Sequence, residues 1–168
     1  LGRTFVPKQF LAFNSTLRKN IEKQVPTELL FNTFEPDKPA TPENPRLGFT
    51  NQEQADRLAA FMRGTGLTYG FAKIVSLMAH GSTSQNNPHE AAHDCGACSG
   101  KRGGPNARLF AAMANRPEIR DLLTERGINI PDDTWFVGAE HDTCSDVVTW
   151  YDVEDIPEGL RSHFESIK

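Results

Sequence analysis

The sequence has no uninterrupted apolar run of the roughly 18 residues that a membrane-spanning helix needs, so we expect no transmembrane segment in this chain. It has only three cysteines, an odd number that excludes a disulfide framework and indicates a reducing compartment with thiols available for metal or redox chemistry. It has no excess of basic residues, because 18 Lys and Arg stand against 22 Asp and Glu. That balance argues against a nucleic-acid-binding protein.

The N-terminus lacks both an initiator Met and a signal peptide, so we expect the chain to be a piece of a longer protein. Its 168 residues are enough for one domain, and 38% hydrophobic residues can fill a modest core.

Basic residues are scarce in the C-terminal third of the chain. Residues 109–168 hold five basic and 13 acidic side chains, a net charge of −8, and no Lys or Arg stands between Gly127 and Leu160. Such a stretch is typical of a solvated face, and the alternative is a docking surface for a basic partner.

Proline is concentrated in one early stretch, where five prolines between residues 26 and 45 predict an extended connector. We therefore divide the chain into an extended or helical N-terminal segment, residues 1–49, and an α/β half-domain, residues 50–168.

Helix signals recur through the half-domain. A capping box at Thr50–Glu53 predicts a helix that ends near Gly66, and early prolines predict helices over Pro105–Asn115 and Pro117–Gly127. A last short helix is expected to begin near Pro157. Its predicted inward residues are Leu160, Phe164 and Ile167.

Two short apolar runs predict strands. Residues 71–79 read as a buried parallel strand that ends at His80, and residues 134–139 as a second strand that ends at residues 140–142. Strand, loop, helices and strand form a βαβ unit, so the predicted fold class is α/β, a partial Rossmann-like unit with parallel strands and flanking helices. The predicted aromatic core residues are Trp135, Phe136 and Trp150.

A long polar loop, residues 81–104, follows the first strand, and three of the five histidines and two of the three cysteines fall within residues 80–98. Zinc prefers imidazole and thiolate ligands, so His80 and Cys95 are candidate zinc ligands. The Cys95-x-x-Cys98 pair leaves open a structural zinc site that also uses His93 or His80.

Cationic residues precede the helix that begins near Pro105. A helix N-terminus presents free N–H groups to anions, so Lys101, Arg102, Asn106 and Arg108 form a candidate site for a small oxyanion such as bicarbonate. The alternative is an ordinary helix start with solvated charges.

A second polar cluster ends the second strand. There Asp142 is a candidate to orient His141, and both are possible metal ligands or neighbours of a ligand. The alternative is that these polar residues only line the edge of the sheet. We expect Cys144 to be an ordinary buried thiol.

Four strings carry a resemblance. HGSTSQNNPHEAAHDCGAC at residues 80–98 continues into GGPNAR at residues 103–108, and IPDDT and EHDT stand at residues 130–134 and 140–143. Together they resemble the DabA family of bacterial inorganic carbon transporter subunits, over about half of the chain.

The resemblance implies a β-carbonic-anhydrase-like core. It implies Zn²⁺ held by a Cys and an Asp of an upstream Cys-x-Asp-x-Arg segment and by a later His and Cys, which match His80 and Cys95. It also implies a membrane-embedded, proton-translocating partner similar to an antiporter subunit of respiratory complexes, energy-coupled uptake of CO₂ as bicarbonate, and a peripheral position on the cytoplasmic face of the bacterial inner membrane.

The sequence departs from that pattern because it contains no Cys-x-Asp-x-Arg. We therefore expect the zinc-binding part of a carbonic-anhydrase-like core that is inactive as an isolated chain and binds zinc weakly unless His93, Cys98 or His141 is recruited. Two other hypotheses stay open, a non-catalytic module with a structural Cys/His zinc site and a metal-free interaction domain that uses the acidic C-terminal region.

Overall fold

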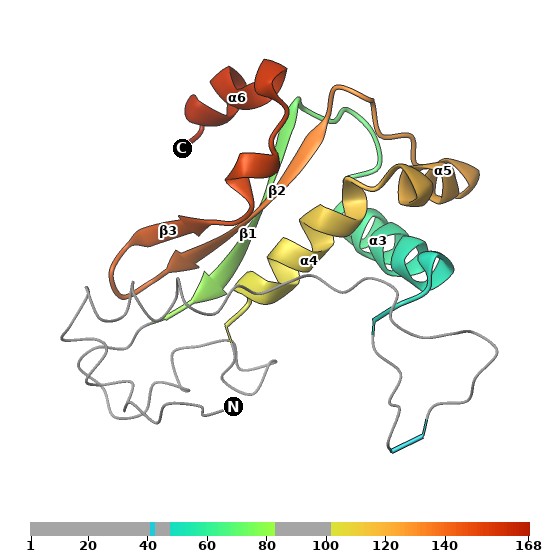
Figure 1. Cartoon of the computed structure of the whole chain (residues 1–168), viewed down its shortest axis with the longest axis horizontal. Helices are drawn as coiled ribbons and strands as arrows, with labels where there is room; N and C mark the ends of the chain where they lie inside the picture. Colours follow the sequence, from blue (N-terminus) through green and yellow to red (C-terminus); the bar gives the residue numbers. More distant parts are fainter. Residues whose placement is uncertain (1–40, 43–47, 83–101) are drawn as a thin grey trace.

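The structure is a computed structural model that describes residues 41–42, 48–82 and 102–168 (Figure 1). The proline-rich segment and most of the His/Cys loop lie outside these ranges, so the predicted boundary at residue 49 stays a prediction. The described helices and strands are α3 (Asn51–Thr65), β1 (Ile74–Gly81), α4 (Gly104–Ala114), α5 (Pro117–Glu125), β2 (Trp135–Asp142), β3 (Val147–Trp150), the short 3₁₀ helix η3 (Val153–Asp155) and α6 (Glu158–Glu165).

The sheet has the order β1-β2-β3. β1 and β2 run parallel and pair in register from Ile74 opposite Trp135 to Gly81 opposite Asp142. β3 runs antiparallel to β2 and pairs only with its last residues, from Ala139 onward. The predicted α/β class and the parallel βαβ unit are confirmed.

Helix α3 forms where the sequence predicts it. The Thr50 hydroxyl accepts the N–H of Glu53 at 3.1 Å, and the Glu53 carboxylate accepts the N–H of Thr50 at 2.9 Å, which is the predicted capping box. Gly66 ends the helix in the left-handed region, with φ of 79°, a conformation that glycine adopts without a steric penalty.

Helix α4 lies directly on β1 and β2. At Gly138 of β2, a Cβ atom would stand 2.7 Å from the backbone of Arg108, so the close approach of helix and strand requires glycine there. In Figure 1, α4 lies below and to the right of the diagonal of β1 and β2, and α6 lies above and to the left of their upper end.

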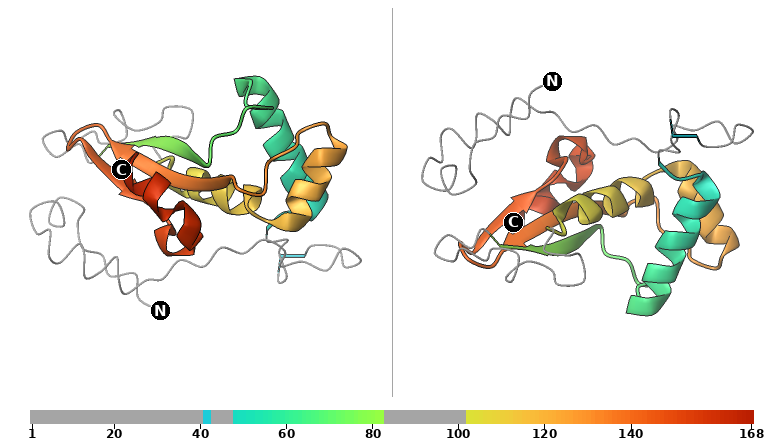
Figure 2. Two further views of the ribbon diagram at one scale, coloured as in Figure 1. Left: turned by 90° about the horizontal axis from the view of Figure 1, so that it is seen from above. Right: turned by 90° about the horizontal axis from the view of Figure 1, so that it is seen from below.

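Two apolar clusters hold the layers together. The larger one joins α3, α4 and α5 to Val75, Leu77 and Phe136 of the sheet, and Figure 2 shows α3 and α5 side by side at the end of the molecule away from β3. The smaller one packs α6 against Val137 and Trp150. Because successive strand residues face opposite sides, α4 and α6 cover opposite faces of the sheet.

Several expectations about burial are wrong. β1 is not a buried strand, since Ser76, Met78 and His80 are exposed on the face where α6 reaches only the amino-terminal end of the sheet. Ile167 is 49% exposed because α6 ends at Glu165, whereas Leu160 and Phe164 of the same helix are buried as predicted. Of the predicted core aromatics, Phe136 is buried, and Trp135 and Trp150 are half-buried.

β1 begins three residues later than the predicted run 71–79 and ends at Gly81, one residue beyond His80. β2 ends at Asp142, within the predicted end at residues 140–142. The short strand β3 was not predicted.

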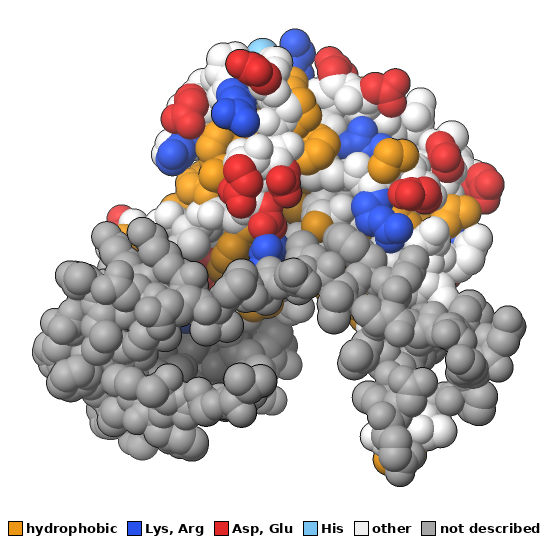
Figure 3. All heavy atoms as spheres, in the orientation of Figure 1, with side chains coloured by type: hydrophobic (Ala, Val, Ile, Leu, Met, Phe, Trp, Pro, Cys, Tyr) orange, Lys and Arg blue, Asp and Glu red, His pale blue; other side chains and the backbone are white. Residues whose placement is uncertain are grey.

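Among the described residues, no helix is long and apolar enough to cross a membrane. Over the described surface visible in Figure 3, Asp and Glu side chains are interspersed with Lys and Arg.

Candidate functional site

The carboxyl ends of β1 and β2 form one polar edge of the sheet, the place where open α/β sheets bind ligands. Six of the predicted site residues are described in the structure, and four lie outside the described residues. The first group is His80, Arg102, Asn106, Arg108, His141 and Asp142, and the second is His93, Cys95, Cys98 and Lys101.

The structure brings His80 and His141 together. They are register partners on β1 and β2, so their side chains leave the sheet on the same face, the one that α6 covers at its other end. His80 is exposed, and the Nε2 atom of His141 lies 2.7 Å from Oδ1 of Asp146.

Asp142 does not orient His141, contrary to the prediction. Adjacent residues of a strand point to opposite faces, and Asp142 points to the α4 face. Its Oδ1 accepts the N–H groups of Cys144 at 3.0 Å and Ser145 at 3.4 Å, and its Oδ2 lies 3.5 Å from Nη2 of Arg102. The carboxylate next to His141 is that of Asp146.

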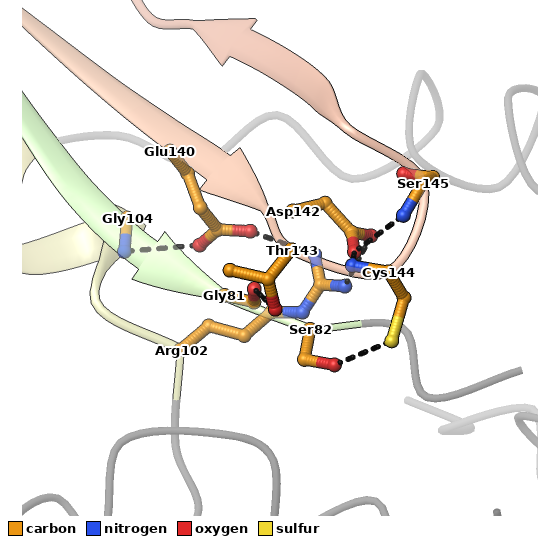
Figure 4. A network of polar contacts seen from close by, with 9 residues as sticks. All are labelled: Gly81, Ser82, Arg102, Gly104, Glu140, Asp142, Thr143, Cys144 and Ser145. Atoms are coloured by element: carbon orange, nitrogen blue, oxygen red, sulfur yellow. Dashed lines mark hydrogen bonds and ion pairs between the residues drawn. The ribbon is translucent and has the colours of Figure 1, made fainter.

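Glu140 forms the centre of a polar network on the α4 face (Figure 4). Its side chain is only 4% exposed, yet both oxygens are occupied: Oε1 accepts from Nη1 of Arg102 at 2.8 Å and Oε2 accepts the N–H of Gly104 at 3.0 Å. Gly104 is the first residue of α4, so this carboxylate neutralises the positive end of the helix.

Of the predicted anion-binding residues, Arg102 has partners within the protein, and Lys101 lies outside the described residues. Arg102 pairs with Glu140 and Asp142, and a free oxyanion at the start of α4 would have to displace the Glu140 carboxylate. Asn106 is exposed in the first turn of α4. Anion binding stays a prediction.

Arg108, the last of the predicted anion-binding residues, is paired with an acidic residue just beyond β3. It makes a two-pronged contact with Asp152, with Nε to Oδ2 and Nη2 to Oδ1 both 2.6 Å. The hydrogen bond that Arg108 donates to Asp152 raises the pKa of Arg108 above its ordinary value, so this guanidinium is a fixed cation held in an ion pair.

Cys144 is exposed, contrary to the prediction of a buried thiol. It stands in the turn between β2 and β3, and its Sγ lies 3.1 Å from Oγ of the buried Ser82. In the same turn, Thr143 donates its N–H to the carbonyl oxygen of Gly81 at 3.0 Å. The turn thereby contacts the end of β1 (Figure 4).

The sequence reasoning missed the role of Glu140. It placed this residue in a polar cluster at the end of the strand but gave it no role. A usable signal was present, because alternation along β2 puts Glu140 on the same face as the core residue Phe136, where a carboxylate needs a cationic partner.

Among the described residues at this edge, the ligand atoms offered by His80 and His141 are of the kind that zinc binds. His80 offers an exposed imidazole at a fixed strand end, and zinc takes imidazole and thiolate ligands. Within residues 41–42, 48–82 and 102–168, no group of three or more His, Cys, Asp and Glu side chains could hold a metal ion. Further ligands would come from residues 83–101 or from the rest of a longer polypeptide.

Comparison with known proteins agrees with the resemblance. The family described as "Probable inorganic carbon transporter subunit DabA" matches residues 1–168. Proteins of that name from Methylococcus capsulatus, Dechloromonas aromatica and Nitrosococcus oceani are 63%, 54% and 50% identical over 94%, 96% and 99% of this chain.

These alignments cover 15%, 16% and 15% of the three relatives, so the chain spans about 15% of the length of the curated relatives it matches. No solved structure matches the chain. The family match over all 168 residues and the identities above show that the chain belongs to the DabA family.

Proposed function

We propose that the chain forms part of a subunit that takes up inorganic carbon, CO₂ or bicarbonate, in bacteria. The observation that carries this proposal is the match of the whole chain to relatives named as inorganic carbon transporter subunits. Because the chain spans about 15% of their length, its own contribution is a part of that activity.

We propose that this part binds zinc through His80 and Cys95, with the remaining ligands outside the described residues. Zinc supplies a nucleophile at neutral pH by lowering the pKa of a coordinated water, the chemistry of CO₂ hydration. The chain's own contribution is to hold the His80 imidazole at the carboxyl end of β1, next to His141. Lys101 and Arg102 are the proposed cations for bicarbonate near the start of α4, and binding through Arg102 requires that bicarbonate displaces the Glu140 carboxylate.

The name of the relatives, a transporter subunit, supports the presence of a partner subunit. In this proposal that partner is a membrane-embedded, proton-translocating subunit, as the resemblance implies. The chain would then act at the cytoplasmic face of the inner membrane as a peripheral part of the assembly. Co-purification of the full-length protein with a membrane subunit from bacterial membranes tests this point, and recovery of the protein without any membrane partner contradicts it.

Metal analysis of the purified chain tests the zinc site. We expect His80→Ala and Cys95→Ser to lower the bound zinc and His163→Ala, an exposed histidine on α6, to leave it unchanged. If Cys98→Ser removes the metal while His80→Ala does not, the site is a structural Cys/His site. A chain that binds no zinc at all supports the interaction-domain hypothesis.

Stopped-flow measurement of CO₂ hydration tests whether the chain is catalytically active by itself or only within the full-length protein. We expect no zinc-dependent turnover from the isolated chain, because two ligands hold zinc weakly, and turnover from the full-length protein. Robust zinc-dependent turnover by the isolated chain would show that its own residues complete the catalytic site.

A further inference from the structure

We propose that Glu140 is a positioning residue for His80: its buried carboxylate holds Arg102 and the first turn of α4 against the end of β1. This inference rests on the proposed zinc-binding function, since it assigns a task to the residues around the proposed ligand. The side chain of Glu140 and the imidazole of His80 lie on opposite faces of the sheet.

The contacts of Glu140 join two segments that are far apart in the sequence, the end of β2 and the start of α4. The carboxylate belongs to β2, Arg102 precedes α4, and the N–H of Gly104 begins α4. Asp142, two residues further along β2, holds the same guanidinium from its other nitrogen at 3.5 Å. Two buried carboxylates therefore fix one arginine at the entrance of α4 (Figure 4).

Glycines on both sides leave room for this carboxylate. A Cβ atom at Gly81 of β1 would stand 2.6 Å from Oε1 of Glu140, and a Cβ at Gly104 would collide with Oε2 of Glu140 and with the hydroxyl of Tyr151. The backbone of β1 and the backbone of α4 thus both approach the carboxylate as closely as only glycine permits.

The network is connected to His80 through the backbone. Gly103, between Arg102 and Gly104, donates its N–H to the carbonyl oxygen of His80 at 2.9 Å. A Cβ at Gly103 would stand 3.2 Å from that oxygen, so the turn lies directly on the end of β1. By holding the residues around Gly103 in place, Glu140 therefore also holds the backbone of His80, the proposed zinc ligand.

A purely structural role would not require a charge at this position. Burying an ion pair costs desolvation energy that neutral residues of similar volume avoid, so we attribute the presence of this pair to the geometry that it imposes. Partners that orient metal ligands from outside the coordination sphere change metal affinity by about 10- to 100-fold when they are replaced.

Glu140→Gln is the most informative variant. Its amide oxygen still accepts the N–H of Gly104, but the negative charge that pairs with Arg102 is lost. The matched control is Asp152→Asn, which removes the negative charge of an ion pair made by Arg108 of α4. In the metal-free chain we expect amide exchange at Gly103 to accelerate about tenfold in Glu140→Gln, beyond any change in global stability. An unchanged rate at Gly103 would overturn the proposal.

Zinc affinity gives the second measurement, by competition with a chelator at a temperature where circular dichroism shows all variants folded. We expect Glu140→Gln to weaken zinc binding about 10- to 100-fold and Asp152→Asn to leave it unchanged. Wild-type affinity in Glu140→Gln, with binding lost in His80→Ala, would overturn the positioning role and leave the proposed zinc site intact. Equal zinc binding by the wild type and His80→Ala would refute the zinc site, and the exchange measurement then decides the role of Glu140.

Discussion

The side-chain amide of Asn115 binds both backbone polar groups of Phe136. Nδ2 donates to the carbonyl oxygen of Phe136 at 2.8 Å, and Oδ1 accepts the N–H of Phe136 at 2.9 Å. β3 pairs with β2 only from Ala139 onward, so no residue of β3 lies opposite Phe136. Asn115 therefore takes the place of a neighbouring strand and satisfies the N–H and the C=O of Phe136.

Replacing Asn115 by Ala should therefore be costly. Asn115→Ala leaves an N–H and a C=O without their partner beside a buried residue, and we expect a loss of about 3 kcal/mol in the free energy of unfolding. Asn115→Asp keeps the acceptor and loses the donor, so its loss should be smaller. Urea unfolding followed by circular dichroism measures both, and an Ala variant as stable as the wild type would contradict this account.

Gly138 and Gly64 should respond to alanine in opposite ways. Gly138→Ala places a Cβ 2.7 Å from the backbone of Arg108, and separating α4 from β2 should cost about 1–3 kcal/mol. Gly64 lies inside α3 with nothing within 4 Å of an added Cβ, so Gly64→Ala should stabilise the chain by about 0.5–1 kcal/mol. Thermal unfolding of the two variants should shift the midpoint in opposite directions.

The pair formed by Arg108 and Asp152 should couple α4 to the segment before η3. A double-mutant cycle with Arg108→Lys and Asp152→Asn should give a coupling of about 1 kcal/mol, because lysine cannot reproduce the two-pronged contact.

The pH dependence of this pair follows from the raised pKa of Arg108. A raised pKa in the folded state gives a contribution that is complete below the ordinary pKa of arginine and is lost only above it. Titration of Arg108 should therefore change stability by nothing measurable between about pH 6 and 9. A coupling energy that vanishes within this range would contradict the assignment.

The capping box of α3 should be worth about 1 kcal/mol. Thr50→Ala removes the acceptor for the N–H of Glu53, and Thr50→Ser keeps it. Helix content and urea unfolding should separate the two variants, and equal stabilities would show that the hydroxyl is not needed.

Local signals in the sequence predicted much of the fold. The capping box of α3, the prolines that open α4 and α5, and the parallel βαβ unit are all seen in the structure. The cap and the prolines act on backbone groups a few positions away, so their effects do not depend on the rest of the chain. The parallel order of β1 and β2 follows from the helices between the two apolar runs. The short strand β3 has no such signal, because it is mostly exposed and depends on its pairing with β2.

The partners of charged residues could not be predicted in the same way. Arg102 and Glu140 are 38 positions apart, and Arg108 and Asp152 are 44 apart, so only the folded arrangement decides which charges meet. The error at Asp142 was avoidable, since alternation along a strand already excludes that it orients the adjacent His141.

The composition of β1 affects the solubility of this chain of 168 residues when it is produced alone. Its eight residues include no Lys, Arg, Asp, Glu or Pro, and among the described residues only one strand, β2, pairs with it. Charges and prolines are what edge strands use to prevent pairing with other molecules. We therefore expect this segment, when produced alone, to self-associate through β1 and to gain solubility from Ser76→Lys, since Ser76 is exposed.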